Sequence, residues 1–159
     1  MKRLLLYLSI VVFFSSLGYG VYKDIQFDIQ CKGYLELAAN ANSIELAKSN
    51  LDKAIQYIEK NQLTSGNSAL FIKSPSNNIT FWYANLKACQ KEIWEMSVKG
   101  GTTLEQTNLL MKLRESLLNN EVVIVPEFLS IYPYQKVTIL MLYISAIFGI
   151  LIGLILRIE

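Results

Sequence analysis

The 159-residue chain contains no histidine and only two cysteines, Cys31 and Cys89. The lack of histidine excludes Ser-His-Asp and Cys-His nucleophile systems and histidine-ligated zinc sites. The cysteines stand 58 positions apart and form no CxxC pair, so neither a dithiol redox motif nor a thiolate metal site is indicated. We therefore expect a protein that is not an enzyme and that holds no metal or cofactor.

The chain also lacks a glycine-rich phosphate loop and an excess of basic residues. Gly100 and Gly101 form an isolated pair, which is more typical of a linker than of a phosphate-binding loop. Residues 24–136 carry 11 Lys and Arg against 12 Asp and Glu, a net charge of −1. Because no basic patch results, we expect no nucleic-acid partner.

Charge is absent from a long stretch near each end of the chain. Residues 137–156 form an uncharged apolar run. As a helix of about 20 residues rising about 1.5 Å each, this run matches a hydrocarbon core of about 30 Å. Since a helix satisfies its own backbone hydrogen bonds in lipid, the pattern predicts a C-terminal transmembrane helix over residues 137–157.

The uncharged stretch at residues 4–22 follows two basic residues and has two interpretations. A basic start, an apolar core and small residues up to Gly20 are typical of a cleaved signal peptide. The stretch is also long enough to span a bilayer, and Tyr19 and Tyr22 lie where an interfacial aromatic belt is found. We favour a retained transmembrane anchor over residues 1–23.

The charges nearest the two stretches predict an orientation. Lys2 and Arg3 precede the first stretch and Arg157 follows the second. Positive residues in short flanks favour the cytoplasmic side. We therefore expect an integral protein of a bacterial inner membrane, with both termini cytoplasmic and residues 24–136 forming an extracytoplasmic domain.

The hydrophobic pattern of residues 24–136 predicts helices. Apolar residues repeat at alternating spacings of four and three positions, with Lys48 as the polar exception. The first stripe comprises Leu37, Ala41, Ile44, Lys48, Leu51, Ile55 and Ile58; the second comprises Trp82, Leu86, Cys89, Ile93 and Met96; a third helix is expected at residues 103–119. The expected fold class is all-α, a helical hairpin or small helical bundle between two transmembrane helices.

Two short apolar runs, residues 69–72 and 122–125, lie outside these helices. The first is bracketed by turn-forming residues and the second is closed by Pro126. One interpretation is a minor two-stranded β element that pairs 69–72 with 122–125. The other is a pair of loops that tuck apolar side chains under the bundle.

One position decides between two arrangements of the first soluble helix. Asn42 and Glu45 have the spacing of a capping box, which would break the helix predicted over residues 24–61. An unbroken rod would place Cys31 about 30 Å from the level of Cys89 on a neighbouring antiparallel helix, too far for a disulfide. If the helix is broken, Cys31 and Cys89 lie at the same level along the packed helices. The sequence then allows either a disulfide between them or two free buried thiols.

Small residues on one face of the C-terminal span predict close helix packing. Ser145, Gly149 and Gly153 are spaced four apart, and Ser16 and Gly20 form a shorter face in the first span. The partner helix is either the other span of the same chain or a second membrane protein, including a second copy.

An aromatic cluster is the candidate for partner docking. Phe81, Trp82 and Tyr83 are consecutive, and Trp94 follows three turns later. Three consecutive side chains cannot all face one side of a helix, so at least one is either accessible or covered by residues 69–72. An accessible aromatic surface would favour protein docking.

Several segments resemble a group of small bacterial membrane proteins of uncharacterised function. These segments are residues 31–35, 38–47, 81–83 with 85–87, and 108–115. The resemblance implies a bacterial envelope protein with a helical extracytoplasmic domain, and it transfers no site residue. We expect a non-enzymatic, membrane-anchored interaction or scaffold protein, whose partners are the lipid bilayer and an envelope or membrane protein, or a second copy. The alternative is a ligand sensor that signals through a separate subunit, because only three residues follow the second apolar run.

Overall fold

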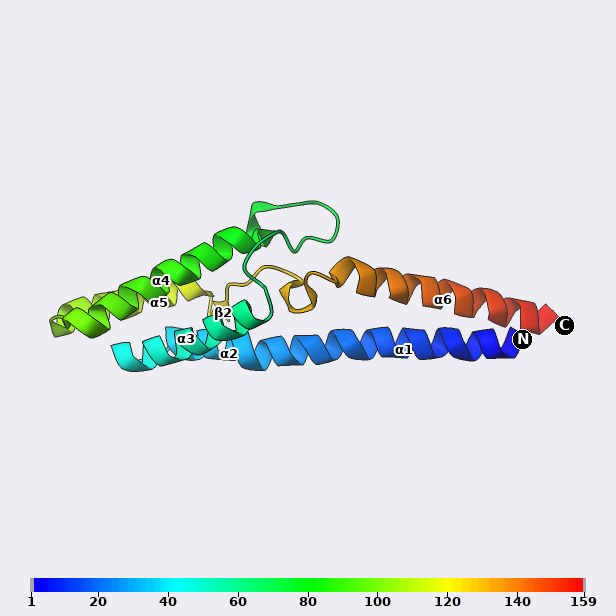
Figure 1. Cartoon of the computed structure of the whole chain (residues 1–159), viewed down its shortest axis with the longest axis horizontal. Helices are drawn as coiled ribbons and strands as arrows, with labels where there is room; N and C mark the ends of the chain where they lie inside the picture. The colour runs from blue at the N-terminus through cyan, green and yellow to red at the C-terminus, as the bar shows by residue number, and fades with distance from the viewer. Residues whose placement is uncertain (1, 159) are drawn as a thin grey trace. The chain divides into compact units, whose positions relative to one another are not determined.

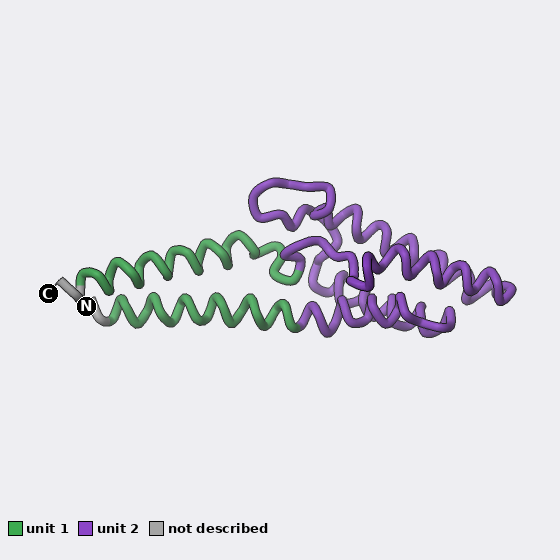
Figure 2. Tube along the Cα trace, turned by 180° about the vertical axis from the view of Figure 1, so that it is seen from behind, with its two compact units in different colours: residues 1–25, 130–159 green, residues 26–129 purple. Residues whose placement is uncertain are grey.

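The structure, a computed structural model, describes the backbone of residues 2–158 and the side chains of residues 4–155. The side chains of Lys2, Arg3 and Arg157, which carry the predicted orientation, lie outside this range. The chain divides into two compact units (Figure 2). We call residues 1–25 with 130–159 the terminal unit, and residues 26–129 the central unit.

Both long apolar stretches are helical, as predicted. Helix α1 spans Lys2–Phe27 and helix α6 spans Gln135–Ile158 (Figure 1). Each is long and apolar enough to cross a membrane, and only 6% and 11% of their most apolar windows are buried. The core helix of a soluble protein would be mostly buried, so the low burial is compatible with membrane spans and, for α1, also with a signal sequence.

The chain stays helical past the end of α1 and then breaks. A π turn, η1 (Asp28–Lys32), leads directly into α2 (Gly33–Ala39). Helix α3 (Ile44–Lys60) begins after a gap, with the Ser43 hydroxyl accepting a hydrogen bond of 3.3 Å from the Leu46 amide. The break suggested by the sequence is therefore present, but its cap is Ser43 and not Asn42, which is exposed.

Helices α2 and α3 pack against α4 (Ile79–Lys99) and α5 (Thr103–Leu117) to form the core of the central unit. The α3 stripe is buried at Ile44, Leu51, Ile55 and Ile58, as its spacing predicts. Leu37 is 56% exposed, because the chain reverses between α2 and α3 and the predicted stripe does not continue through the break. A complete capping box between Thr102 and Glu105 starts α5. The all-α fold class is confirmed.

The minor β element is present with a different partner. Strand β1 (Leu118–Asn119) pairs antiparallel with β2 (Val122–Val123), so one strand lies in the expected run 122–125. The two turn residues, Asn120 and Glu121, have φ values of 49° and 65°, as a tight hairpin turn requires. A local hairpin closes a far shorter loop than a pairing with residues 69–72, and residues 69–72 form part of a loop instead.

Candidate functional site

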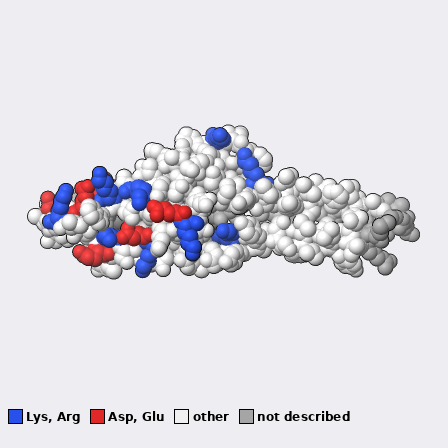
Figure 3. Space-filling model, in the orientation of Figure 1, with Lys and Arg blue, Asp and Glu red and all other residues white. Residues whose placement is uncertain are grey.

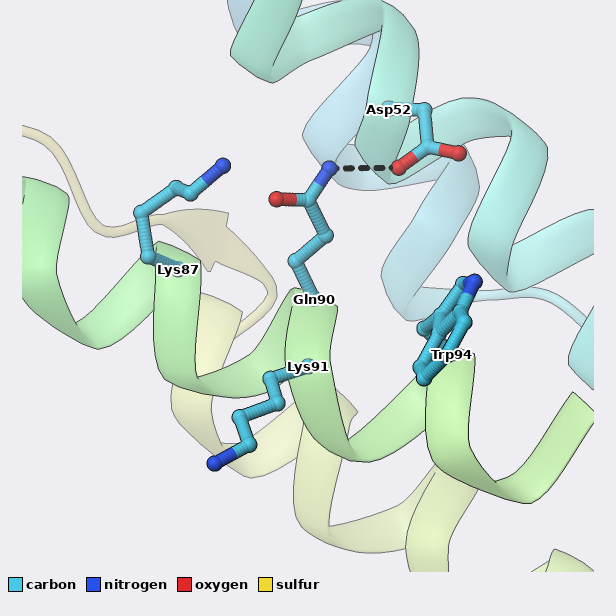
Figure 4. A pocket seen from close by; sticks show the side chains of 5 residues that line it. All are labelled: Asp52, Lys87, Gln90, Lys91 and Trp94. Carbon is cyan, nitrogen blue, oxygen red and sulfur yellow. Dashed lines mark hydrogen bonds between the residues drawn. The ribbon is translucent and has the colours of Figure 1, made fainter. Parts of the chain in front are cut away.

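An open hollow of about 620 Å³ lies between α3 and α4 on the surface of the central unit. The two helices pack against each other, and each carries buried residues, such as Ile55 and Ile58 on α3 and Leu86 on α4. The residues that line the hollow lie nearer the surface. On α4, residues spaced three or four positions apart share the face beside the hollow. The lining residues are Asp52 from α3 and Lys87, Gln90, Lys91 and Trp94 from α4 (Figure 4).

Polar contacts organise the centre of the hollow. The Gln90 amide donates a hydrogen bond of 2.6 Å to Asp52 Oδ1, and Lys48 donates one of 3.2 Å to Asp52 Oδ2. In Figure 4 the Gln90 side chain reaches Asp52 between Lys87 and Trp94. Both carboxylate oxygens of Asp52 are therefore engaged within the fold.

Two groups in the hollow remain available to a partner. The Trp94 side chain is 53% exposed, although tryptophan is usually well buried. The Lys91 side chain is 77% exposed, and its nearest carboxylate oxygen, on Glu95, is 4.0 Å away. An exposed indole can bind an apolar group, and an accessible ammonium group on the same helix can attract a negative charge. Among the described residues, no group of three His, Cys, Asp or Glu side chains is placed to hold a metal ion.

Next to the hollow, Tyr83 ties the start of α4 to the end of α3. Its hydroxyl donates a hydrogen bond of 2.6 Å to Glu59 Oε1, and Lys87 lies 3.4 Å from the same oxygen. The Tyr83 hydroxyl, with a smaller contribution from Lys87, lowers the pKa of the Glu59 carboxyl. Burial, assisted by the Glu59 contact, raises the pKa of Tyr83 to about 12.

Tyr83→Phe is expected to destabilise the central unit slightly and to weaken its pH dependence in acid. The pKa of Glu59 is lower in the folded state than in the unfolded state. The ionised carboxylate therefore stabilises the fold above the ordinary carboxyl pKa, and this stabilisation is lost as pH falls through the folded-state pKa. Because Glu59 is 47% exposed, we expect a loss below about 1 kcal/mol at about pH 7, which becomes smaller toward about pH 3 as Glu59 is protonated. Denaturant titrations at both pH values measure it. Tyr34→Phe is the control, and an equal acid dependence in the two variants would contradict the assignment.

The fold separates the four aromatic residues that were predicted to form one docking surface. Trp82 is 8% exposed, and its indole N–H donates a hydrogen bond of 2.9 Å to the Ile124 carbonyl, so it belongs to the core. Tyr83 is half-buried and bonded to Glu59. Phe81 is 64% exposed, and of the four aromatics only Trp94 lines the hollow.

The two cysteines are free, so the disulfide that the sequence left open is not formed. Cys31 is fully buried. Cys89 is half-buried and makes a side-chain hydrogen bond with Ser116 of α5, which directs it toward that helix. Burial is the main cause that raises the pKa of Cys89, so its thiol is poorly reactive at neutral pH.

In the terminal unit, two of the five predicted small residues pack one span against the other. Ser145 is 5% exposed, and a Cβ atom added at Gly149 would lie 3.4 Å from Ser9 Oγ of α1. Ser9 is not among the predicted small residues, although it is the only small polar residue in the run 4–14. Together with their neighbours they line a hollow of about 300 Å³, formed by Ser9, Ile10, Phe13, Phe14, Ser145, Ala146, Gly149 and Ile150.

The other three small residues do not share this contact. A Cβ atom added at Gly153 or Gly20 would meet no atom within 4 Å. The Ser16 hydroxyl donates a hydrogen bond of 2.8 Å to the Val12 carbonyl of its own helix. Packing between the two spans of one chain is therefore observed at Ser145 and Gly149.

Residues 69–72 depart from both sequence interpretations at their tip. Ala69 is buried, but Phe71 is 87% exposed and Ile72 is 85% exposed. These two side chains neither join a strand nor pack beneath the bundle. No pattern in the sequence predicts that these two residues, among the apolar residues of loops, are exposed.

Comparison with known proteins gives no relative for this chain: no family model, no curated protein and no solved structure matches it. The functional assignment therefore rests on the residues and geometry described above.

Proposed function

We propose that this chain is a non-enzymatic, membrane-anchored interaction protein that binds a peptide segment of another envelope protein in the hollow between α3 and α4. The observation that carries the proposal is Trp94, which stands 53% exposed at the edge of a hollow of about 620 Å³. Exposed tryptophans beside a hollow are typical of the anchors that dominate binding energy at protein interfaces.

The charges around Trp94 favour an acidic segment. Both oxygens of Asp52 already accept hydrogen bonds from Gln90 and Lys48, so this carboxylate is held within the fold. Lys87 is 44% exposed but is paired with Glu59 at 3.4 Å, whereas Lys91, one turn before Trp94 on α4, is 77% exposed and leaves its ammonium group available. A partner with an apolar side chain next to a carboxylate complements this surface.

The two apolar helices supply the anchor in this proposal. The helical run continues without a break from α1 into α2, where Leu35 is fully buried in the core of the central unit. A retained α1 would therefore hold the central unit to the membrane directly through this continuous helical run. The basic flanks of the chain support cytoplasmic termini and an extracytoplasmic central unit, and a bacterial inner membrane is the location that we propose for it.

A peptide titration of the full chain in detergent micelles tests the binding site. The probes are synthetic peptides that carry one aromatic residue among glutamates, and matched peptides in which lysine replaces each glutamate. We expect the acidic peptides to bind more tightly, and Trp94→Ala to weaken binding by about tenfold or more, as at interface hot spots.

Val98→Ala is the matched control, because Val98 is 65% exposed one turn further along α4 and does not line the hollow. It should leave binding unchanged. Equal binding of both peptide series, or equal effects of the Trp94 and Val98 substitutions, would refute the proposed site.

A ligand sensor that signals through a separate subunit is the second candidate. The volume of the hollow favours it, since small-molecule pockets have volumes of about 300 to 1,000 Å³. Such pockets bury most of their ligand, whereas this hollow is open and is lined by five residues. Saturable binding of a small carboxylate that Trp94→Ala abolishes, without any peptide binding, would favour the sensor.

A further inference from the structure

The loop between α3 and α4 presents two large apolar side chains to solvent. Phe71 is 87% exposed and Ile72 is 85% exposed, more than any other large apolar side chain that the structure describes, including those of α1 and α6. An apolar pair so exposed in water carries a hydration cost of a few kcal/mol, which burial in an apolar phase would remove.

The base of this loop is held by hydrogen bonds, so the exposed tip is supported by structure. The Ser68 amide donates to the Asn77 carbonyl at 3.0 Å, and the Ile79 amide donates to the Gly66 carbonyl at 3.0 Å. The Asn67 side chain donates to the Ser74 carbonyl at 3.1 Å. These bonds close the loop on both sides of Phe71 and Ile72.

The charges of the loop suit an anionic surface. Between Lys60 and Lys87 the only charged residue is Lys73, directly after Ile72. On the face drawn in Figure 3, the acidic side chains lie over the helices of the central unit and none lies over the loop. A lysine next to exposed apolar residues can stay at the level of the lipid headgroups while its neighbours enter the apolar layer.

A short connection links the base of the loop to α6. The Asn77 side chain accepts a hydrogen bond of 3.2 Å from the Glu127 amide, and α6 begins eight residues later at Gln135. Eight residues span at most about 29 Å. A membrane that contains α6 is therefore a nearby apolar phase at high effective concentration.

We propose that Phe71 and Ile72 insert into the interfacial layer of the membrane that holds α1 and α6, with Lys73 at the level of the lipid phosphates. This proposal rests on the membrane anchoring proposed above and not on peptide binding between α3 and α4. The bilayer thus becomes a second binding partner of the central unit.

Depth-dependent quenching on the full chain tests this insertion. The chain carries Cys89→Ser and Ile72→Cys, is labelled with an environment-sensitive fluorophore, and is reconstituted in phosphatidylethanolamine and phosphatidylglycerol vesicles that contain spin-labelled lipid. We expect strong quenching and a blue-shifted emission. Phe71→Ser in the same labelled chain should reduce both effects, and its own exposed side chain makes a folding defect unexpected.

Two other label positions separate the outcomes. Ser65→Cys lies exposed in the same loop and should stay unquenched, while Tyr143→Cys, at a residue 65% exposed on α6, should be quenched. Quenching at Tyr143 without quenching at Ile72 would overturn the loop insertion and leave the anchoring intact. Absence of quenching at Tyr143 would overturn both. An Ile72 label that lipid does not quench, but that native membranes shield from aqueous iodide, would assign the loop to a protein partner instead.

Discussion

Leu51→Ala is expected to lower the free energy of unfolding of the central unit by about 3 kcal/mol, within the range of about 2–5 kcal/mol for buried leucines. Leu51 is fully buried on α3, and Ala47, Ala54 and Ile55 of the same helix are buried with it. Close-packed surroundings relax only in part, so the loss combines the transfer free energy of the removed carbons with the cost of a cavity.

Leu46→Ala is the matched control for this result. Leu46 lies on the same helix but is 52% exposed, so we expect a change within about 0.5 kcal/mol. Both variants are measured by denaturant titration of the full chain in detergent micelles, in a Trp94→Phe background where the buried Trp82 is the only tryptophan reporter. Equal destabilisation by the two substitutions would show that α3 does not pack through the face containing Leu51.

Gly149→Ile is expected to weaken the packing of α1 against α6 by about 1–3 kcal/mol, the usual cost of overpacking. A Cβ atom at this position would already lie 3.4 Å from Ser9 Oγ. Isoleucine adds two further carbons on Cβ, and its χ1 angle is restricted in a helix, so these carbons have little freedom to avoid the neighbouring span. Each 1.4 kcal/mol changes the ratio of paired to separated helices about tenfold.

Cross-linking in membranes measures this change. Cysteines at Ile10 and Ala146, which line the same hollow as Gly149, are joined by a short bismaleimide in a Cys89→Ser background. Gly153→Ile is the control, because a Cβ atom there meets nothing within 4 Å. We expect the cross-linked fraction to fall only for Gly149→Ile. A similar fall for both variants would indicate a general effect on the helix and would contradict a specific contact at Gly149.

Hydrophobic spacing predicted the helices of the central unit well, because the buried face of a helix repeats every 3.6 residues whatever its partner is. The exact start of α3 was harder to predict from the sequence. Asn42 and Ser43 are both good capping residues, and the backbone conformation that selects Ser43 depends on how the chain reverses between α2 and α3. The β hairpin was missed in part, since its turn residues, Asn120 and Glu121, are not the glycine pair that marks such turns most clearly.

The candidate site could be predicted only as a set of aromatic residues. Consecutive side chains on a helix point about 100° apart, so the sequence shows that Phe81, Trp82 and Tyr83 face different directions, but not which one faces the core. That choice depends on the contact of Trp82 with Ile124, 42 positions along the chain. The pairing of Gln90 with Asp52, 38 positions apart, likewise depends on how α3 and α4 are packed.

The sequence by itself determined the helical class, the two long apolar helices and the exclusion of histidine-dependent chemistry, because these follow from composition and from local periodicity. The tertiary structure decided which small residues bring α1 and α6 into contact, which tryptophan is buried, and that Phe71 and Ile72 are exposed on a closed loop. These features depend on contacts between residues far apart in the chain. Local patterns carry the tendency of a side chain to be buried, whereas only the packed fold determines whether a partner is there to bury it.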